Sequence, residues 1–150
     1  MNNVHYMSNR HDWGTPADLY KMLDDKFHFT VDVCAQSHNA KHSRYFTPEQ
    51  DGLKQNWGGE VAFCNPPYGR EIGKWVKKAS ESMGTVVMLI PARTDTKWFH
   101  DYIYTNESAQ VFFLRGRVKF DGQKQGAPFP SMVVVFNSEH ITNLNNCIEY

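Results

Sequence analysis

Apolar residues recur along this chain at two spacings, one typical of amphipathic helices and one typical of buried strands. Two segments carry apolar residues three and four positions apart, which predicts helices. These positions are Leu19, Met22, Leu23 and Phe27 in the first segment, and Ile72, Trp75, Val76, Ala79 and Met83 in the second. We expect Thr15 as the N-cap of the first helix, Pro16 at its first position, and Gly84 at the end of the second. A third helix is expected over residues 96–104.

Five apolar runs predict strands, over residues 29–35, 61–64, 85–90, 111–114 and 131–136, and residues 44–46 are a candidate short strand. The run at 85–90 is almost wholly apolar, as in a strand that is buried on both faces. Because strands and helices alternate, we predict an α/β fold with a largely parallel sheet and helices on both faces. For 150 residues we expect a single domain, which begins with a loose polar arm at residues 1–12.

The composition limits how the protein could contact nucleic acid and where in the cell we expect it. Sixteen basic and sixteen acidic residues leave no net charge, so contact with nucleic acid needs a local patch. No apolar run approaches the length of a membrane span, and the first residues lack the features of a signal peptide. The three cysteines are widely spaced, which favours reduced thiols. We therefore expect a cytoplasmic protein without a membrane partner.

The tetrapeptide Asn65-Pro66-Pro67-Tyr68 stands directly after the predicted strand at 61–64. Neither proline has a backbone N–H, so the strand ends here, and carbonyl groups and the Asn65 side-chain oxygen gather as acceptors beside an aromatic ring. Such a strand tip suits a flat molecule that carries an amino group. In isolation, the tetrapeptide is better explained as a strand-ending turn with a buried tyrosine. Residues 32–37 and 91–93 also follow predicted strands, and ligands bind where the ends of parallel strands meet.

Four other segments accompany this tetrapeptide. They are Trp13-Gly14-Thr15-Pro16, Val31-Asp32-Val33-Cys34-Ala35, Asp51-Gly52-Leu53 and Gly116-Arg117-Val118-Lys119-Phe120. Together, from about Trp13 to Phe136, they resemble the S-adenosylmethionine-dependent amino-methyltransferases, in particular the phage-type DNA adenine methyltransferases. The resemblance implies a reduced Rossmann-like methyltransferase sheet. It also implies site-specific methyl transfer from S-adenosylmethionine to the exocyclic N6 amino group of an adenine that is flipped out of double-stranded DNA. A phage-encoded enzyme of this kind would act in the host cell cytoplasm.

The resemblance assigns catalysis to Asn65, Pro66, Pro67 and Tyr68. The Asn65 side chain and the Pro66 carbonyl would accept hydrogen bonds from the two amino hydrogens, and Tyr68 would stack on the flipped base. The lone pair of an adenine amino nitrogen is delocalised into the ring, so two acceptors would favour a tetrahedral, nucleophilic nitrogen. Contacts of this kind strengthen as positive charge develops, and they therefore lower the barrier.

The residues that the resemblance assigns to the cofactor lie near the predicted strand ends and the first helix. They are Trp13, Thr15, Pro16, Asp32, Ala35, Asn39, Asp51 and Leu53. Asp32 would bind the ammonium group of the cofactor's methionine portion. Asp51 would accept a hydrogen bond from the amino group of the cofactor's adenine ring. Simpler explanations are a loop cap for Asp32, an Asp-Gly turn for Asp51 and a helix-entry staple for Trp13. The turn at residues 35–38 departs from the family, because it lacks the glycines that are usual there.

DNA contacts are expected from four basic residues, which are Arg93, Arg115, Arg117 and Lys119. On charge alone, a solvated basic hairpin explains the last three about as well. No separate target-recognition domain is evident, so specificity would come from loops such as residues 115–130, or from the second subunit of a homodimer. Cys34, His38 and His42 stand four residues apart, but a zinc site needs a further ligand or a bound water, so we predict no metal.

Two other functions stay open for this sequence. An amino-methyltransferase that acts on RNA or on a protein glutamine would carry the same tetrapeptide. The second is a methyltransferase-like nucleic-acid-binding module that has lost catalysis. The missing glycine turn and the small size of the chain are compatible with this alternative.

Overall fold

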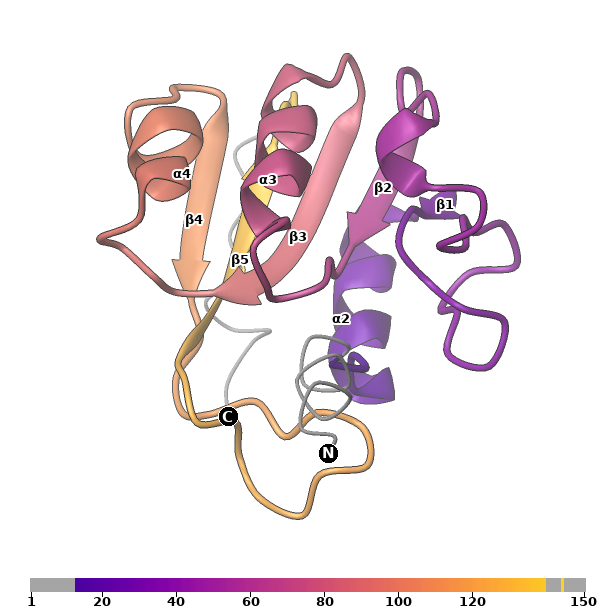
Figure 1. Ribbon diagram of the computed structural model, residues 1–150. Coiled ribbons are helices and arrows are strands. Elements are labelled where there is room, and N and C mark those ends of the chain that lie inside the picture. The colour runs from indigo at the N-terminus through magenta and orange to yellow at the C-terminus, as the bar shows by residue number, and fades with distance from the viewer. Residues whose placement is uncertain (1–12, 140–143, 145–150) are drawn as a thin grey trace.

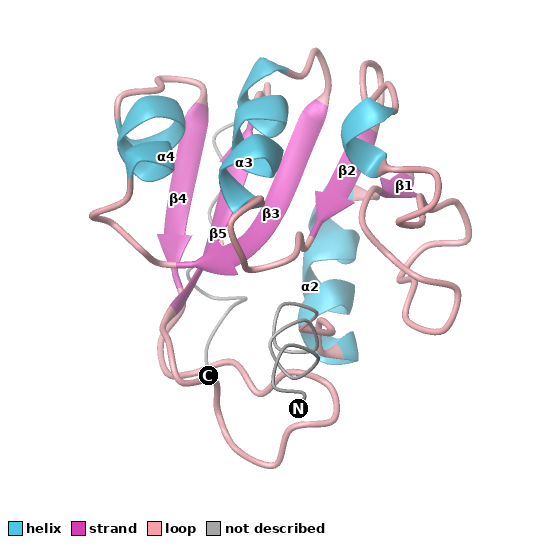
Figure 2. Ribbon diagram, viewed as in Figure 1, coloured by secondary structure: helices cyan, strands magenta, loops and turns pink. Residues whose placement is uncertain are grey.

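A five-stranded mixed sheet forms the centre of the molecule in the computed structural model, which describes residues 13–139 and residue 144 (Figures 1 and 2). Its strands are β1 (Val31–Asp32), β2 (Val61–Cys64), β3 (Thr85–Pro91), β4 (Ala109–Phe113) and β5 (Ser131–Phe136). The helical elements are α2 (Ala17–Phe27), the 3₁₀ turn η1 (Gly52–Lys54), α3 (Ile72–Glu81), and α4 (Lys97–Phe99), which continues as the π-helical η2 (His100–Tyr104). The predicted α/β class and the predicted order of helices and strands are confirmed.

The sheet is less parallel than expected. The strand order is β1-β2-β3-β5-β4. β1, β2 and β3 are parallel neighbours, whereas β5 pairs antiparallel with both β3 and β4. β4 therefore points the same way as the first three strands, but the expected largely parallel sheet is a mixed one. The reason is that residues 114–130 join β4 to β5 without a helical crossover, so β5 returns antiparallel beside β4.

Helices cover the sheet on two faces. α3 connects the parallel strands β2 and β3, and its buried residues are Ile72, Trp75, Val76 and Ala79. α2 buries Leu19, Tyr20 and Leu23, and the ring centroid of Tyr20 lies 5.1 Å from that of Phe63 in β2. Figure 1 shows α3 and α4 in front of the sheet and α2 behind β2. The central strands β3 and β5 are buried along almost their whole length, as their apolar sequences predict.

Two helix ends differ from the expected pattern. Pro16, in an extended conformation with ψ of 141°, is the N-cap of α2, and Ala17 is its first residue. The expectations of Thr15 as the N-cap and of Pro16 at the first helical position are therefore both wrong. The Thr15 hydroxyl instead accepts a hydrogen bond from the Asn65 side chain. Ser82, and not Gly84, caps the end of α3. A glycine is needed at position 84 because a Cβ there would lie 2.3 Å from the Glu60 carbonyl oxygen.

β1 is shorter than the predicted strand at 29–35. The Val33 N–H continues the ladder by one bond, to the Phe63 carbonyl oxygen, and the chain then turns away. The candidate strand at 44–46 forms a single bridge, between Tyr45 and Asp32. None of the helices within residues 13–139 has the length and apolar character that a membrane crossing requires.

Candidate active site at the carboxyl edge of the sheet

Three strand ends meet at one edge of the sheet. β1 ends at Asp32, β2 leads directly into Asn65, and β3 ends at Pro91. Since β1 and β2 are adjacent and parallel, Asp32 and Asn65 lie on neighbouring strand ends. An open pocket at this edge is lined by residues that include Trp13, Thr15, Asp32, Asn39, Lys41 and Asn65. The edge therefore brings together Asn65 and four of the residues that were predicted to bind the cofactor.

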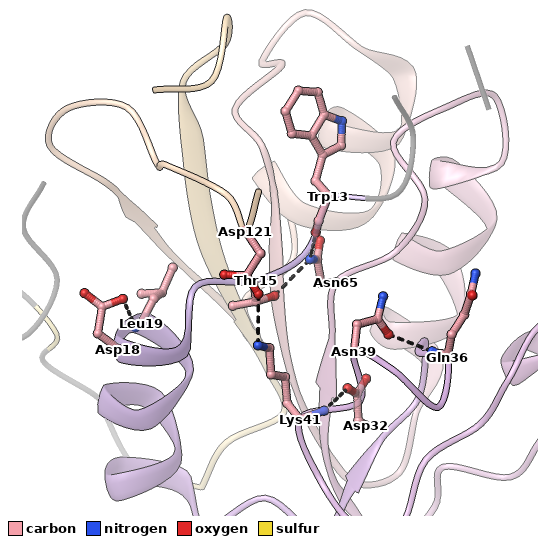
Figure 3. A network of polar contacts seen from close by, with 10 residues as sticks. All are labelled: Trp13, Thr15, Asp18, Leu19, Asp32, Gln36, Asn39, Lys41, Asn65 and Asp121. Atoms are coloured by element: carbon pink, nitrogen blue, oxygen red, sulfur yellow. Dashed lines mark hydrogen bonds and ion pairs between the residues drawn. The ribbon is translucent and has the colours of Figure 1, made fainter. Parts of the chain in front are cut away.

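The Asn65 side chain is held by the segment that precedes α2 (Figure 3). Its Nδ2 donates to the Trp13 carbonyl oxygen and, at 2.9 Å, to the Thr15 hydroxyl oxygen. Because a carbonyl oxygen can only accept, the amide nitrogen must face Trp13 and the amide oxygen must face away from it. That oxygen, Oδ1, is buried and has no hydrogen-bond partner within the described part of the chain. The site therefore holds an oriented acceptor that lacks a donor.

Pro66 supplies a second acceptor beside Asn65. Its side chain is buried. Among residues 13–139, no backbone N–H donates to the Pro66 carbonyl oxygen. Pro67 follows without an N–H of its own, so the two prolines keep backbone donors away from this strand end, as predicted.

Tyr68 is buried, with 4% of its surface exposed. Its hydroxyl donates to the Leu89 carbonyl oxygen at 2.8 Å. Phe120 and Phe129 lie edge-on to its ring, with centroids 6.0 and 5.7 Å away. Burial raises the pKa of the Tyr68 hydroxyl well above its usual range, so the phenol stays neutral. The ring that was expected to stack on a base is thus covered by residues 114–130 in this structure.

Asp32 is a buried acid on the wall of the pocket, with 2% of its surface exposed. Its Oδ1 accepts from the Cys34 N–H at 3.2 Å. Its Oδ2 accepts from the Lys41 N–H at 3.0 Å, as Figure 3 shows. Burial raises the pKa of Asp32 to about 6, although these two N–H groups oppose the shift. Asp32 therefore caps the loop after β1, and near neutral pH it also places a negative charge in the pocket. A cationic ligand would stabilise that charge.

Four predicted cofactor residues are not among the side chains that line this pocket within residues 13–139. They are Pro16, Ala35, Asp51 and Leu53. The Asp51 Oδ1 accepts from the Leu53 N–H at 3.1 Å, which is the Asp-Gly turn of the simpler explanation. Gly52, between them, packs so tightly on Val33, the residue after β1, that a Cβ there would lie 2.1 Å from the Val33 carbonyl oxygen. This close approach keeps residues 51–53 beside the end of β1.

The turn after β1 is built without glycine. The Gln36 N–H donates to the Asn39 Oδ1 at 2.8 Å, and the Asn39 N–H donates to the Gln36 carbonyl oxygen at 3.1 Å. The described non-glycine residues with positive φ are His28, Asp51 and Asn137, so residues 35–38 all have ordinary backbone conformations. The missing glycines therefore cause no conformational strain in this turn.

The four basic residues predicted to contact DNA are all exposed. Three of them lie in the connection of residues 114–130, which folds over the same edge of the sheet (Figure 1). Leu114, Val118 and Phe120 point into the protein, while Arg115, Arg117 and Lys119 between them are exposed. Arg93 follows β3 at the same edge. The Arg117 Nη1 donates to the Ala127 carbonyl oxygen at 3.2 Å, so this residue also holds the connection together.

Sequence reasoning missed how residues 114–130 are attached to the site. The Asp121 N–H donates to the Gly14 carbonyl oxygen at 2.9 Å, and the Asp121 carboxylate lies 3.3 Å from the Lys41 Nζ. The Trp13 ring packs against Phe120 and Phe129, with centroids 5.3 and 5.4 Å away. Lys41 and Asp121 are 80 residues apart in the chain, so no local pattern could reveal their contact.

Metal-ligand side chains do not gather at this site. Across residues 13–139, no group of three or more His, Cys, Asp or Glu side chains is arranged to hold a metal ion.

Comparison with known proteins identifies the family. The family model for DNA N-6-adenine-methyltransferase (Dam) matches residues 4–146. A DNA N-6-adenine-methyltransferase of Haemophilus phage HP1 (strain HP1c1) is 32% identical over 139 residues, which cover 86% of this chain and 80% of that protein. A DNA N-6-adenine-methyltransferase of Escherichia phage T1 is 33% identical over 92 residues, which cover 58% of this chain and 38% of that protein. The resemblance seen in the sequence is confirmed, and the chain belongs to the DNA N-6-adenine-methyltransferase family.

Proposed function

We propose that this chain uses S-adenosylmethionine to methylate the exocyclic N6 of a flipped adenine at a specific sequence in double-stranded DNA. The orientation of Asn65 carries the proposal. Its Oδ1 is buried without a partner among the described residues, because Trp13 and Thr15 take the amide nitrogen. A buried acceptor in this state needs a donor. Membership of the family makes an adenine amino group the donor of choice.

Asn65 and Pro66 would act on the nucleophile. Their two oxygens would accept from the two hydrogens of the amino group and draw its nitrogen toward a tetrahedral geometry. Positive charge grows on that nitrogen as the methyl group is transferred, so the contacts would be stronger in the transition state than in the ground state. Pro67 would preserve this arrangement by offering no competing backbone donor.

Tyr68 would stack on the flipped adenine, which contributes roughly 1–3 kcal/mol for a base on an aromatic ring. Because Phe120 and Phe129 contact the ring, entry of the base would require residues 114–130 to move aside. The Tyr68 hydroxyl is bound to β3 through Leu89, so the ring would keep its place during that movement.

S-adenosylmethionine supplies an electrophilic methyl group when it is bound. The chemistry of the pocket fits its methionine end, because the buried Asp32 carboxylate would hold the ammonium group. The Asn39 Oδ1 is used by the Gln36 N–H, which leaves Nδ2 for a ribose hydroxyl. Asp51 would accept a hydrogen bond from the amino group of the cofactor's own adenine, and Leu53 would pack on that adenine ring. The remaining residues that the resemblance assigns to the methionine end are Trp13, Thr15, Pro16 and Ala35.

DNA would lie against the exposed basic residues that follow the strand ends. These are Arg93, Arg115, Arg117 and Lys119. Specificity would come from residues 114–130 or from the second subunit of a homodimer. The proposal includes a reduced Rossmann-like sheet, a single catalytic domain, and action in the cytoplasm, that of the host if the protein is phage-encoded. Parallel β1, β2 and β3, which deliver three strand ends to one edge, support this type of sheet.

Transfer of a radiolabelled methyl group tests the proposal. The protein is incubated with labelled S-adenosylmethionine and, in separate reactions, with double-stranded DNA, RNA, or a protein with accessible glutamines. We expect label in DNA alone, on N6 of adenine, as identified by mass spectrometry of the nucleosides. Label in RNA or protein would establish an alternative substrate. Cofactor binding in calorimetry without transfer to any substrate would identify a binding module that has lost catalysis.

A further inference from the structure

We infer that Thr15 is a positioning residue for the Asn65 amide, and that its hydroxyl serves methyl transfer and not cofactor affinity. The inference rests on the proposed function of Asn65. It differs from the family resemblance, which places Thr15 at the methionine portion of the cofactor.

The Thr15 hydroxyl does not cap the following helix, although its position in the sequence suggests that it would. Thr15 is buried, with 2% of its surface exposed. It does not cap α2, because Pro16 occupies the N-cap position and that cap has no side-chain hydrogen bond. The hydroxyl oxygen lies 2.9 Å from the Asn65 Nδ2, across 50 positions of the chain. This buried hydroxyl bonds a side chain of the candidate active site and not the backbone of the helix, which indicates a role in that site.

Two acceptors on one amide nitrogen determine the orientation of the whole amide plane. The NH₂ group of Asn65 has two hydrogens, and the Trp13 carbonyl oxygen and the Thr15 hydroxyl oxygen each accept one. The terminal torsion of asparagine is otherwise broad, so one acceptor alone would leave the plane free to rock. With both acceptors present, the direction of Oδ1 is determined. That oxygen is the atom that would receive the amino hydrogen of the base.

Loss of the Thr15 hydroxyl would therefore act on the rate of transfer. An acceptor that rocks out of line holds the nucleophile less well, and small errors of alignment reduce rates strongly. Cofactor affinity would change little, because the Thr15 oxygen already serves Asn65 and the buried carboxylate of Asp32 would still bind the ammonium group.

Three variants test the inference. Thr15→Val keeps the shape but removes the hydroxyl, and Thr15→Ser keeps the hydroxyl. Thr85→Val is the control, because it removes a hydroxyl that donates to the Asn137 carbonyl oxygen at the amino end of β3, away from the site. For Thr15→Val we expect a single-turnover methylation rate about fivefold to tenfold lower, with a calorimetric Kd for S-adenosylmethionine within about twofold of wild type. Thr15→Ser restores the rate, and Thr85→Val leaves it unchanged.

A second measurement does not depend on activity. The NH₂ signals of Asn65 are identified in nitrogen-15 NMR spectra by their absence from Asn65→Ala. We expect their exchange with solvent to be slow in wild type and in Thr15→Ser, and faster in Thr15→Val. If wild type methylates no substrate, the proposed function fails, and this exchange still decides whether Thr15 holds the amide.

Three results would overturn the inference. Equal losses of rate and of cofactor affinity in Thr15→Val would make Thr15 a cofactor ligand. A serine variant as slow as the valine variant would assign the effect to shape. Unchanged amide exchange in Thr15→Val would show that Trp13 holds Asn65 alone.

Discussion

Asn65 is the residue whose removal should separate catalysis from binding. Asn65→Ala removes the unpartnered Oδ1 acceptor but leaves the Asp32 carboxylate in place. By analogy with the loss of one preorganised transition-state contact, we expect the single-turnover rate to fall about 100-fold or more. The calorimetric Kd for S-adenosylmethionine should stay close to that of wild type.

A neighbouring asparagine provides the matched control. Asn39 lines the same pocket, but its Oδ1 is engaged with the Gln36 N–H in the turn after β1. Asn39→Ala should weaken cofactor binding and keep the rate at saturating cofactor. If the two variants lose rate and affinity alike, Asn65 serves the cofactor or the fold instead of the amine.

Asp32 should make cofactor binding depend on pH. Its pKa of about 6 lies above the ordinary 3.8, so the folded protein binds this proton more tightly than the unfolded chain does. The contribution of Asp32 to the free energy of unfolding therefore falls as pH rises from 3.8 to about 6, and stays low above that. An ammonium group bound to the ionised carboxylate would offset this cost.

Calorimetry across that pH range measures the effect. We expect tight binding of S-adenosylmethionine above pH 6 and a loss of up to about tenfold per pH unit below it, since only the carboxylate binds the cation. The carbon-13 titration of the Asp32 carboxyl should have its midpoint near 6 in the free protein and a lower one with cofactor. An affinity that is constant from pH 5 to 7 would remove Asp32 from the cofactor site.

Among the elements, η1 depends on a glycine in a way that a substitution can reveal. A Cβ at Gly52 would lie 2.1 Å from the Val33 carbonyl oxygen, so Gly52→Ala must displace η1 from Val33, the residue after β1. We expect the free energy of unfolding to fall by about 1–3 kcal/mol or more. Cofactor affinity should also fall, because Asp51 and Leu53 would move with η1.

Gly73 in α3 provides the control for Gly52, because a side chain at this position has room. A Cβ there would meet its nearest atoms, on Trp98, at an ordinary 3.6 Å. Gly73→Ala should therefore raise the free energy of unfolding by about 0.5–1 kcal/mol through helix propensity. Urea unfolding of both variants measures the contrast. Equal stabilities would contradict the close packing of Gly52 on Val33.

The connection from β4 to β5 should carry part of the DNA contact. Lys119 is exposed between the buried Val118 and Phe120, so its removal should leave the fold intact. Lys119→Ala should weaken binding to all DNA sequences and reduce the slope of log affinity against log salt by about 0.9, the value for one lost phosphate contact. Lys77→Ala, on the exposed face of α3, is the control and should change neither quantity. A slope that is the same in both variants would argue against this surface.

For the whole molecule, local patterns predicted most elements and the strand ends that line the candidate site. The helical spacing from Ile72 to Ala79 and the apolar run of β3 are strong predictors. Buried positions recur at regular spacing within one helix or one strand, so a local pattern reveals them. The acceptors of Asn65 and Pro66 were also predictable, because the two prolines end the strand by a local covalent effect. The cap at Thr15 was predicted wrongly, because a partner 50 residues away takes its hydroxyl.

The sequence by itself determined the α/β class, the strand that ends just before Asn65 and the family, since these depend on residue types at short spacings. Only the tertiary structure decided that β5 runs antiparallel, that Phe120 and Phe129 cover Tyr68, and that Trp13 and Thr15 turn the Asn65 oxygen away from themselves. Each of these features is a contact between segments that are distant in the chain. The energies of such contacts depend on how the segments pack together, and no local pattern records that packing.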